Sequence, residues 1–502
     1  MYHRARLLCL SNYAGKLTEF WSNSSRCIHQ MSMKNIVKTP LVCGQPTDES
    51  HPHLVMKGEL IPGIQKEEFM IRRRKLMESV LSTRKDFYHV IVIPSAIRQY
   101  MSDHIPYPFR QNTDFLYFSG CQETDSALVL CGDSVDNFTS TLFLKTYDPQ
   151  SELWNGPSTR AECAPFIFGV DDGKTLPQLS EFIMSELKLK GHNNNCVLWY
   201  NQKQKVQSAV DKTVNNAAAE SSIYLDDSLV NHCHKLRLYK SLAEQNLMRQ
   251  SCQIASKAFI KAMMSTKPGS TEHQLYARLD YECRMGGAEY LAYPPVVAAG
   301  NNANTLHYID NKQQIKDGDL ILVDAGCEYH GYSSDISRTW PANGWFSDAQ
   351  KTLYEATLSV QKELIDMCQA RPSLDTLYEA MCFKLGKALA TAHVFKKNVD
   401  PSELNMLARA LCPHHVSHYL GMDVHDIGTI KKSIKTEPGF IITVEPGVYI
   451  SKNNVRVHEE FLGLGIRIED DVLVTENSIE VLSEDCPKEI ADIEKIMSRQ
   501  TK

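Results

Sequence analysis

The chain has 502 residues, 43% of them hydrophobic, which is enough to bury a core in two or three domains. With a formal net charge of −6, nothing in the overall charge favours nucleic acid, and no apolar stretch reaches the roughly 18 residues of a membrane-spanning helix. The fifteen cysteines follow no regular spacing, which favours free thiols in a reducing compartment over a disulfide framework.

The first 47 residues differ in composition from the rest of the chain. They carry six basic residues against one acid, Glu19, with serine, asparagine and short apolar groups between them. Arginine-bearing, acid-poor segments of this kind are typical of mitochondrial presequences. We therefore predict a presequence and linker over residues 1–50 and delivery to the mitochondrial matrix. A tail without an address is the alternative, and a form begun at Met31 or Met33 would stay in the cytosol.

The next part of the chain predicts a mixed α/β domain over residues 55–232. A helix is expected from Lys66 to Arg84, because helix formers there carry recurring apolar residues. Apolar, β-branched runs then predict four strands, with helical stretches between them. These runs are His89–Ile93, Ala127–Leu130, Thr141–Leu144 and Cys196–Tyr200.

Residues 237–495 predict a second domain, with the boundary near residues 230–240. We expect one long helix from Arg237 to about Met264 and another from Thr271 to Met285, with Ser270 as its N-cap. Strands and turns follow as far as Asp335. Two further helices, at about 347–370 and 373–391, precede the last strands, so the order of helices and strands repeats once.

Four carboxylates interrupt runs that otherwise predict buried strands. Asp324 lies within the run Leu320–Gly326, and Asp335, Glu445 and Glu469 lie in three later runs. A buried anion without a counter-charge costs several kcal/mol, so it is protonated, paired or bound to a metal ion. If the four converge, two divalent cations are the simplest source of the positive charge they require.

Asp324 and Asp335 are expected on the two strands of one β-hairpin. They lie eleven residues apart, joined through Gly326, Gly331 and a polar turn. Facing strands hold side chains about 5 Å apart, which suits one or two shared metal ions. Taken singly, Asp324 could instead cap a strand end and Asp335 could pair with Arg338.

Residues 412–426 contain four histidines, namely His414, His415, His418 and His425. Imidazole mixed with carboxylates suits Mn²⁺, Co²⁺, Fe²⁺ or Zn²⁺ better than Ca²⁺. The HExxH pattern of a zincin helix is absent from this stretch. A solvated polar loop and a mononuclear zinc site with a larger share of histidine ligands remain open as alternatives.

Taken together, these motifs resemble the pita-bread metallopeptidases, which include aminopeptidase P, prolidase and methionine aminopeptidase. The resemblance is carried by Val323–Gly326, Asp335–Thr339, His418–Asp426 and Thr443–Tyr449. It implies a pita-bread (creatinase/aminopeptidase-like) catalytic domain in an α/β (α+β) chain. It also implies two divalent metal ions, with Mn²⁺ expected and Co²⁺, Zn²⁺ or Fe²⁺ as alternatives. The implied ligands are Asp324, Asp335, His418, Glu445 and Glu469.

The segment Tyr107–Gly120 resembles the amino-terminal domain of aminopeptidase P, which methionine aminopeptidases lack. Together with the amino-terminal segment, it extends the resemblance to the mitochondrial type of aminopeptidase P. The implied activity is removal of the first residue from peptides whose second residue is proline, by a homodimer or larger homo-oligomer. A prolidase-type dipeptidase and a non-catalytic pita-bread interaction protein are the alternatives.

The resemblance also implies roles for residues around the metal ligands. His307, His425 and Glu445 are expected to be catalytic, the two histidines by hydrogen bonding to the substrate carbonyl. The expected substrate-binding residues are His307, His414, His425, Arg467, Tyr449 and Tyr293. Arg467 could instead pair with Asp470 or Asp471, and the two tyrosines could instead be core aromatics.

Overall fold

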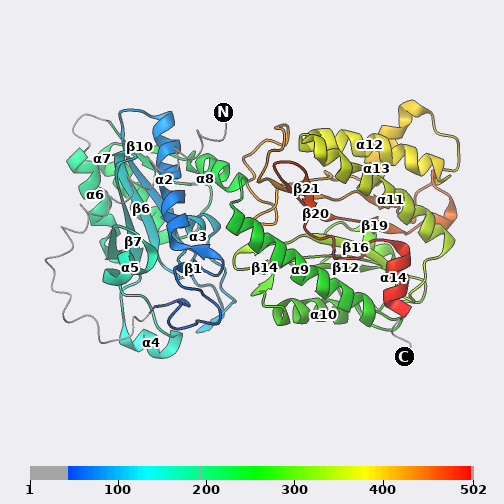
Figure 1. The fold of residues 1–502 in the computed structure, drawn as a ribbon, viewed down its shortest axis with the longest axis horizontal. Helices are drawn as coiled ribbons and strands as arrows, with labels where there is room; N and C mark the ends of the chain where they lie inside the picture. Colours follow the sequence, from blue (N-terminus) through cyan, green and yellow to red (C-terminus); the bar gives the residue numbers. More distant parts are fainter. Residues whose placement is uncertain (1–42, 191–194, 499–502) are drawn as a thin grey trace, which may run out of the picture.

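The computed structural model of the chain describes residues 43–190 and 195–498. Most of the predicted presequence, residues 1–42, lies outside these ranges, so the structure does not bear on that prediction. Figure 1 shows two bodies side by side, the amino-terminal one in blue to green and the carboxy-terminal one in green to red. Within the described ranges, no helix combines the length and apolar character needed to cross a bilayer.

The amino-terminal body is built on a six-stranded mixed sheet with the order β10-β9-β3-β6-β7-β8. Strand β3 pairs antiparallel with β6 and parallel with β9. The elements of this body are β1 (Glu59–Ile61), β2 (Ile64–Gln65), α2 (Lys66–Thr83), β3 (Tyr88–Pro94), β4 (Tyr100–Ser102), β5 (Ile105–Pro106), α3 (Thr113–Ser119), β6 (Ala127–Ser134), β7 (Asn137–Leu144), α4 (Pro149–Asn155), α5 (Ala164–Phe168), β8 (Asp172–Thr175), α6 (Leu179–Lys190), β9 (Cys196–Trp199), α7 (Ser208–Ser221) and β10 (Tyr224–Asp226). The predicted helix and four strands are all present.

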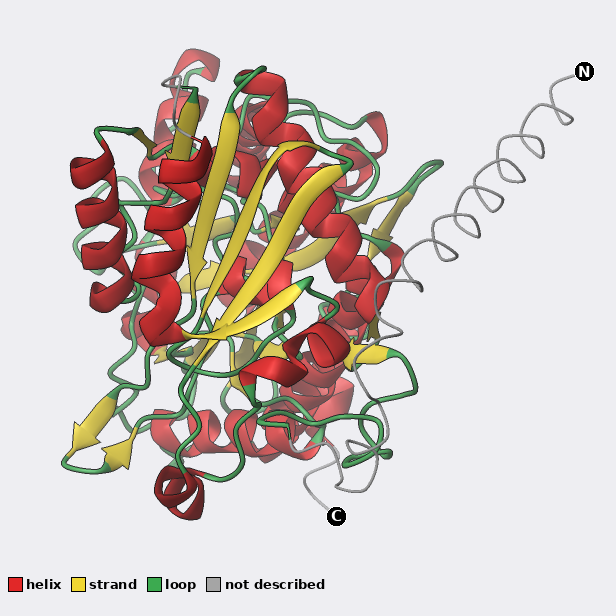
Figure 2. Cartoon of the chain, turned by 90° about the vertical axis from the view of Figure 1, so that its left-hand side faces the viewer, coloured by secondary structure: helices red, strands yellow, loops and turns green. Residues whose placement is uncertain are grey.

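Strand β3 is apolar on both faces because helices cover both sides of the sheet, as Figure 2 shows. Ile91 and Ile93 pack with residues of α2, whereas Val90 and Val92 pack with residues of α6 and α7. Successive side chains of a strand point to opposite faces, so one continuous apolar run serves two separate cores.

The helix predicted from Arg237 to Met264 is two helices, α8 (Leu229–Leu238) and α9 (Leu242–Ser265), so that prediction is wrong. Ser241 starts α9 as its N-cap, and its backbone N–H donates to the side chain of Glu244. This reciprocal capping box is encoded as Ser-x-x-Glu in the sequence. The next helix, α10 (Glu272–Met285), is capped by Thr271 in the same way, one residue later than the predicted cap Ser270.

The carboxy-terminal body places strands between two groups of helices, with α9 and α10 on one side and α12 and α13 on the other (Figure 1). Its further elements are β11 (Tyr290–Leu291), β12 (Val296–Ala299), β13 (Leu320–Ala325), β14 (Cys327–Tyr329), β15 (Tyr332–Ser333), β16 (Ile336–Pro341), α11 (Asp348–Met367), α12 (Leu374–Thr391), α13 (Leu404–Leu411), β17 (Ile441–Val444), β18 (Gly447–Tyr449), β19 (Gly465–Arg467), β20 (Asp470–Val474), β21 (Ile479–Val481) and α14 (Ile490–Met497). Helices followed by strands thus occur twice in succession.

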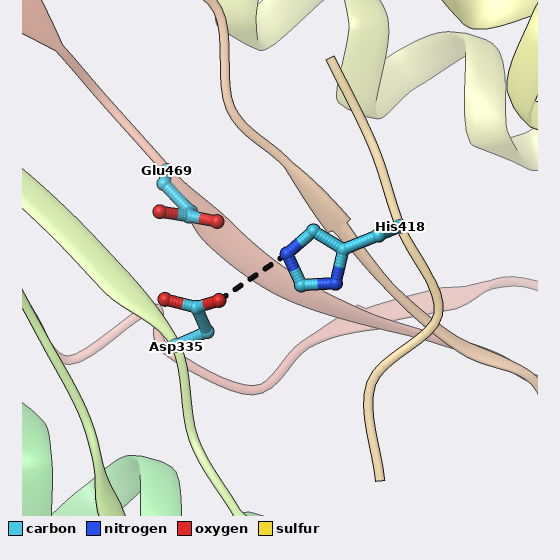
Figure 3. Close-up of side chains that lie close together, drawn as sticks. All are labelled: Asp335, His418 and Glu469. Atoms are coloured by element: carbon cyan, nitrogen blue, oxygen red, sulfur yellow. Dashed lines mark ion pairs between the residues drawn. The ribbon is translucent and has the colours of Figure 1, made fainter. Parts of the chain in front are cut away.

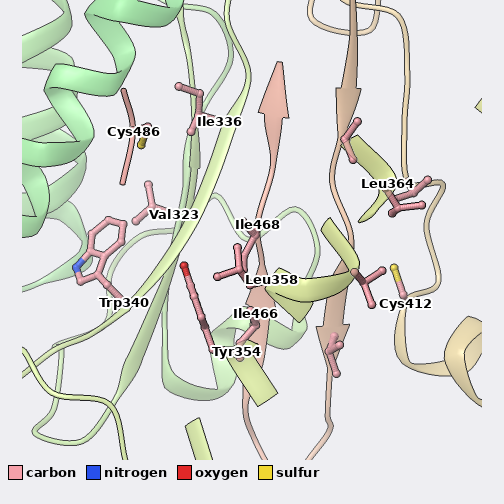
Figure 4. Packing of buried hydrophobic residues seen from close by; sticks show 14 of the residues in the cluster. Val323, Ile336, Trp340, Tyr354, Leu358, Leu364, Cys412, Ile466, Ile468 and Cys486 are labelled. Atoms are coloured by element: carbon pink, nitrogen blue, oxygen red, sulfur yellow. The ribbon is translucent and has the colours of Figure 1, made fainter. Parts of the chain in front are cut away.

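The largest apolar core of the described residues joins the strands of this body to its helices. Val323 of β13, Ile336 and Trp340 of β16, Tyr354 of α11 and Ile466 of β19 are all buried in it (Figure 4). Removing this much apolar surface from water is the main source of rigidity for the strands.

Ionic contacts fasten the two bodies together. Arg237, only 3% exposed, donates to Asp114 of the amino-terminal body at 2.8 Å and to Asp423 at 2.8 Å, and it also pairs with Asp426. Arg110 of the amino-terminal body reaches the other oxygen of Asp423 at 2.9 Å. Residues of the amino-terminal body therefore hold the segment around Asp423, which follows His418 in the chain.

Candidate metal centre and active-site cavity

The structure brings Asp324, which lies in β13, and three acids next to strand ends, Asp335, Glu445 and Glu469, to one cavity of about 490 Å³ together with His418. Asp324, Asp335, Glu445 and Glu469 all line it, although they come from distant parts of the chain. His307, His414, His425 and Arg467 line the same cavity. The cavity is completed by Leu306, His415, Tyr419, Asp426, Ile427, Gly428, Ile430 and Lys432.

Two strand contacts place three of the carboxylates. Strands β13 and β16 pair antiparallel with Asp324 opposite Ser337, as the predicted hairpin requires. Ser337 in turn forms a β-bridge with Glu469 from the last part of the chain. Because side chains alternate along a strand, Asp335 lies on the same face as Ser337. Three acids from three strand segments therefore meet around one serine.

His418 presents one ring nitrogen to the carboxylates. Its Nδ1 lies 3.1 Å from the carbonyl of Tyr419, which can only accept a hydrogen bond, so Nδ1 carries a proton. Its Nε2 lies 3.3 Å from Asp335 Oδ2 and 3.8 Å from Glu445 Oε1. Figure 3 shows the ring directed between Asp335 and Glu469. A backbone carbonyl that holds Nδ1–H in this way prepares Nε2 to be a metal ligand.

The charges at the site are poorly balanced without a cation. Burial, and then the neighbouring carboxylates, raise the pKa of Glu469 well above its ordinary value. Burial raises the pKa of Glu445 to about 7, against the opposing charges of His418 and Arg467. Burial alone would lower the pKa of His418, but Asp335 and Glu445 outweigh it and raise that pKa to about 9. The His418 imidazolium thus supplies positive charge at the point where the acids require it.

The donor set fits a divalent metal ion. Asp335, His418 and Glu469 each offer one ligand atom, and these atoms all lie within 4.8 Å of one another. Carboxylate oxygens with one imidazole are the ligands of Mn²⁺ and related ions, and a dication would offset both the burial and the mutual repulsion that raise the carboxyl pKa values. Asp324 and Glu445 lie around this group on the cavity wall.

Arg467 pairs with Asp324, with 2.6 Å between Nη2 and Oδ2, and not with Asp470 or Asp471. Its Nη1 donates to the hydroxyl of Tyr449 at 2.7 Å, and that hydroxyl lies 2.8 Å from His414 Nε2. Since His414 Nδ1 faces the carbonyl of His415, Nε2 accepts from Tyr449. Arg467 thus donates to Asp324 on one side and to Tyr449 on the other, and Tyr449 continues the chain of hydrogen bonds to the neutral imidazole of His414.

Asp470 faces away from the cavity, into the core of the carboxy-terminal body. It pairs with Arg338 at 2.7 Å, and both side chains are 0% exposed. The suggestion that Asp335 pairs with Arg338 is therefore wrong. Strand alternation explains this sorting, because Arg467 and Glu469 share one face while Ile468 and Asp470 share the other.

The two tyrosines lie behind the cavity wall, and neither is among the residues that line it. Tyr293 is nevertheless not an ordinary core aromatic, because its hydroxyl lies within hydrogen-bond distance of both Asp324 and Asp335 and can donate its one proton to either. Tyr449 is 8% exposed, and its hydroxyl accepts from Arg467 and donates to His414. Direct contact of either tyrosine with a substrate stays a prediction.

Two polar residues that sequence reasoning missed hold the acids in place. Ser337 donates to Glu469 at 2.7 Å and accepts from Arg467 at 2.8 Å. Asp471 accepts the backbone N–H of Asp335 at 2.9 Å. The two-residue spacing from Asp335 to Ser337, and from Glu469 to Asp471, was the signal that could have found them.

Comparison with known proteins places this arrangement in a family. Residues 246–476 match the model for metallopeptidase family M24, and residues 69–198 match the model for the aminopeptidase P N-terminal domain. Xaa-Pro aminopeptidase 3 of Rattus norvegicus is 42% identical over 468 residues, covering 91% of this chain and 90% of that protein. The mitochondrial intermediate cleaving peptidase 55 of Arabidopsis thaliana is 38% identical over 476 residues, covering 93% and 91%.

A solved structure of zinc-substituted Escherichia coli aminopeptidase P in complex with product has a TM-score of 0.79 and 32% identity to this chain. The match covers 88% of this chain and 99% of the Escherichia coli chain. This chain therefore belongs to metallopeptidase family M24, within the aminopeptidase P group. The predicted fold class, an amino-terminal mixed α/β domain followed by a pita-bread domain, is confirmed.

The raised pKa of Glu445 predicts a pH-dependent stability of metal-free protein. Between about pH 4.5 and about pH 7 the folded protein keeps a proton that the unfolded chain has lost, so stability falls as pH rises through this window. After EDTA treatment, Glu445→Gln should match wild type near pH 5 and exceed its unfolding free energy by about 2 kcal/mol near pH 7.5. Urea unfolding at both pH values measures this difference.

Glu460→Gln is the matched control, because Glu460 is exposed in the same body and Gln removes the same single charge. This control should not develop a difference between the two pH values. A Glu445→Gln protein that is less stable than wild type at pH 7.5 would contradict the raised pKa of the buried Glu445 carboxyl.

Proposed function

We propose that this protein is an Xaa-Pro aminopeptidase, which hydrolyses the first peptide bond of peptides whose second residue is proline. The observation that carries the proposal is the convergence of four carboxylates and His418 on one cavity, in a chain 42% identical to rat Xaa-Pro aminopeptidase 3. An amino-terminal domain of the aminopeptidase P type supports the same assignment.

We further propose that Asp324, Asp335, His418, Glu445 and Glu469 hold two divalent metal ions, with Mn²⁺ the expected ion. Four carboxylates and Arg467 carry a combined charge of about −3 when ionised, which one dication would leave negative and two would turn slightly positive. A small positive excess suits a site that receives an oxyanion. When bound, ions of this kind would polarise a carbonyl group and lower the pKa of a bound water to about 7.

Glu445 is the proposed general base. Its carboxyl lines the cavity within the proposed ligand set, so it would accept a proton from the attacking water and pass it to the leaving nitrogen. His307 and His425 are proposed to donate hydrogen bonds to the scissile carbonyl oxygen as negative charge develops there. Both side chains are exposed and line the cavity, so both can reach a bound peptide.

Selection of proline is proposed to depend on the wall formed by His414 and Arg467. The nitrogen of an Xaa-Pro bond carries no hydrogen, so a site for this bond needs no acceptor opposite it. His414 is neutral, since burial and then Arg467 lower its pKa to about 4. A neutral imidazole held by Tyr449 offers a flat face to the proline ring without the cost of burying a charge.

The substrate assignment predicts a clear order of reactivity. With Mn²⁺ present, Arg-Pro-Pro should release arginine, whereas Gly-Pro and Arg-Ala-Pro should react far more slowly. Glu445→Gln should lower kcat by about 10²–10⁴, as expected for loss of a general base. Product analysis by mass spectrometry on these three peptides measures the order.

Cleavage of Gly-Pro alone would instead identify a prolidase-type dipeptidase. Wild-type protein that binds metal and cleaves none of the three peptides would favour a non-catalytic interaction protein.

The metal assignment predicts about two Mn²⁺ per chain by elemental analysis after loading and desalting. Asp335→Asn should lower this content, because Asp335 offers a ligand atom within 4.8 Å of those of His418 and Glu469. His414→Ala serves as a control, since His414 lines the cavity outside the proposed ligand set and should keep the full content. One firmly bound zinc ion per chain would favour the mononuclear alternative.

We propose that the protein acts in the mitochondrial matrix. The net charge of the first 47 residues supports this, and a relative in Arabidopsis thaliana is a mitochondrial intermediate cleaving peptidase. Residues 1–50 fused to a fluorescent protein should therefore enter mitochondria, and a fusion that begins at Met33 should not. Cytosolic fluorescence from the longer fusion would contradict the assignment.

A homodimer or larger homo-oligomer is proposed as well. The β4–β5 hairpin of the amino-terminal body exposes Tyr100, Met101 and Ile105, each more than half accessible. Apolar groups gathered on one short hairpin are typical of a surface that another chain covers. The molar mass in solution decides this point.

A further inference from the structure

Glu272, the first residue of α10, is a carboxylate buried among hydrogen-bond donors. Its side chain is 0% exposed. Oε1 accepts from the backbone N–H of Ala299 and the side-chain amide of Asn302, both at 2.9 Å. Oε2 accepts from the hydroxyl of Tyr308 at 2.8 Å and from the backbone N–H of Gln313 at 2.7 Å. A carboxylate can only accept hydrogen bonds, and these four donors satisfy both of its oxygens.

These four donors belong to one segment, residues 299–313, which runs from the end of β12 towards β13. Ala299 and Asn302 stand near its start, and Tyr308 and Gln313 stand near its end. The backbone N–H of Glu272 also donates to the carbonyl of Gln313 at 3.0 Å. Glu272 therefore ties both ends of the segment to the start of α10.

The segment carries His307, one of the proposed catalytic residues. Its two neighbours, Leu306 and Tyr308, pack on a small buried cluster that includes Val296 and Tyr449. His307 itself is exposed and lines the cavity. The backbone position of His307 is thus set by anchors on either side, and one of these, Tyr308, is bound by Glu272.

The helix does not require this carboxylate to be buried in order to begin. Thr271 already caps α10, with its hydroxyl accepting from the backbone N–H of Gln274. A carboxylate at the first turn gains from the helix dipole even when it is exposed. The four hydrogen bonds of the buried Glu272 carboxylate therefore stabilise residues 299–313 and are not needed to start the helix.

We propose that Glu272 is a positioning residue that holds His307 in register with the substrate carbonyl, an inference that rests on the proposed aminopeptidase activity. Glu272→Gln keeps the volume of the side chain but turns an N–H donor towards one of the two pairs of donors. Tyr308 can rotate its hydroxyl to accept from that amide, whereas the N–H of Gln313 cannot.

The test is a double-mutant cycle between Glu272→Gln and His307→Ala, read as kcat and KM for Arg-Pro-Pro. In the wild-type background, Glu272→Gln should lower kcat by about ten- to a hundredfold with a smaller change in KM, because displacement of a catalytic group acts on the transition state. In the His307→Ala background, the same change should lower kcat by less than about twofold.

Hydrogen exchange supplies a measurement that needs no activity. Glu272→Gln should speed amide exchange across residues 299–313 and leave α12 unchanged, at a temperature where both proteins are folded. Thr271→Ala is the matched control, because it weakens the start of the same helix without touching the four bonds to Glu272. It should leave kcat and exchange in the segment close to wild type.

Tyr308→Phe keeps the proposal testable if Glu272→Gln does not fold, since it removes a single bond to Glu272 and keeps the ring in its cluster. It should lower kcat to a smaller extent and, again, only when His307 is present. Equal losses of kcat with and without His307, or no loss in either background, would overturn the proposal. An inactive wild type would overturn the proposed function instead, while the exchange measurement would still test the hold on the segment.

Discussion

The mutual repulsion of four buried or half-buried carboxylates is the constraint on which the rest of this structure depends. Asp324, Asp335, Glu445 and Glu469 surround one cavity, and Arg467 and His418 supply the positive charge that the chain itself contributes. A fold that brings such groups together must be stable enough to oppose their separation. The strands that carry them are accordingly anchored in the largest apolar core of the described residues.

Alternation along those strands divides the polar residues into two sets with different tasks. Ser337, Arg467 and Glu469 face the cavity and bind one another. Arg338 and Asp470, one position away, face the core as a fully buried ion pair that also takes Lys488. Breaking such a pair leaves an uncompensated charge in the interior, so it fixes the register of β16 against the last strands. The same register brings Ser337 to Glu469.

Much of this was accessible from the sequence, for physical reasons that differ between elements. The acids at 324, 335, 445 and 469 were visible because each lies in a run that predicts a buried strand, and the hairpin joining the first two was predicted from Gly326, Gly331 and the polar turn between them. The break between α8 and α9 was also encoded, by the capping box at Ser241, but the apolar spacing on both sides masked it. Partners distant in the chain were not accessible. Two acids lie close to Arg467 in the sequence, yet Arg467 pairs with Asp324, because tertiary packing decides which carboxylate it meets.

The amino-terminal body takes part in the site as well as lying beside it. Arg110 donates to the carbonyl of Met422 and to the side chain of Asp423, and Asp114 pairs with Arg237, which also binds Asp426. These contacts hold the stretch that runs from His418 to His425, so one metal-ligand candidate and one catalytic candidate are braced from outside the pita-bread domain. Arg237 stands at the junction, at the end of α8, with acids of both bodies around it. Each acid there lowers the cost of burying the arginine, and the arginine lowers the cost of burying each acid, so neither body satisfies this cluster without the other.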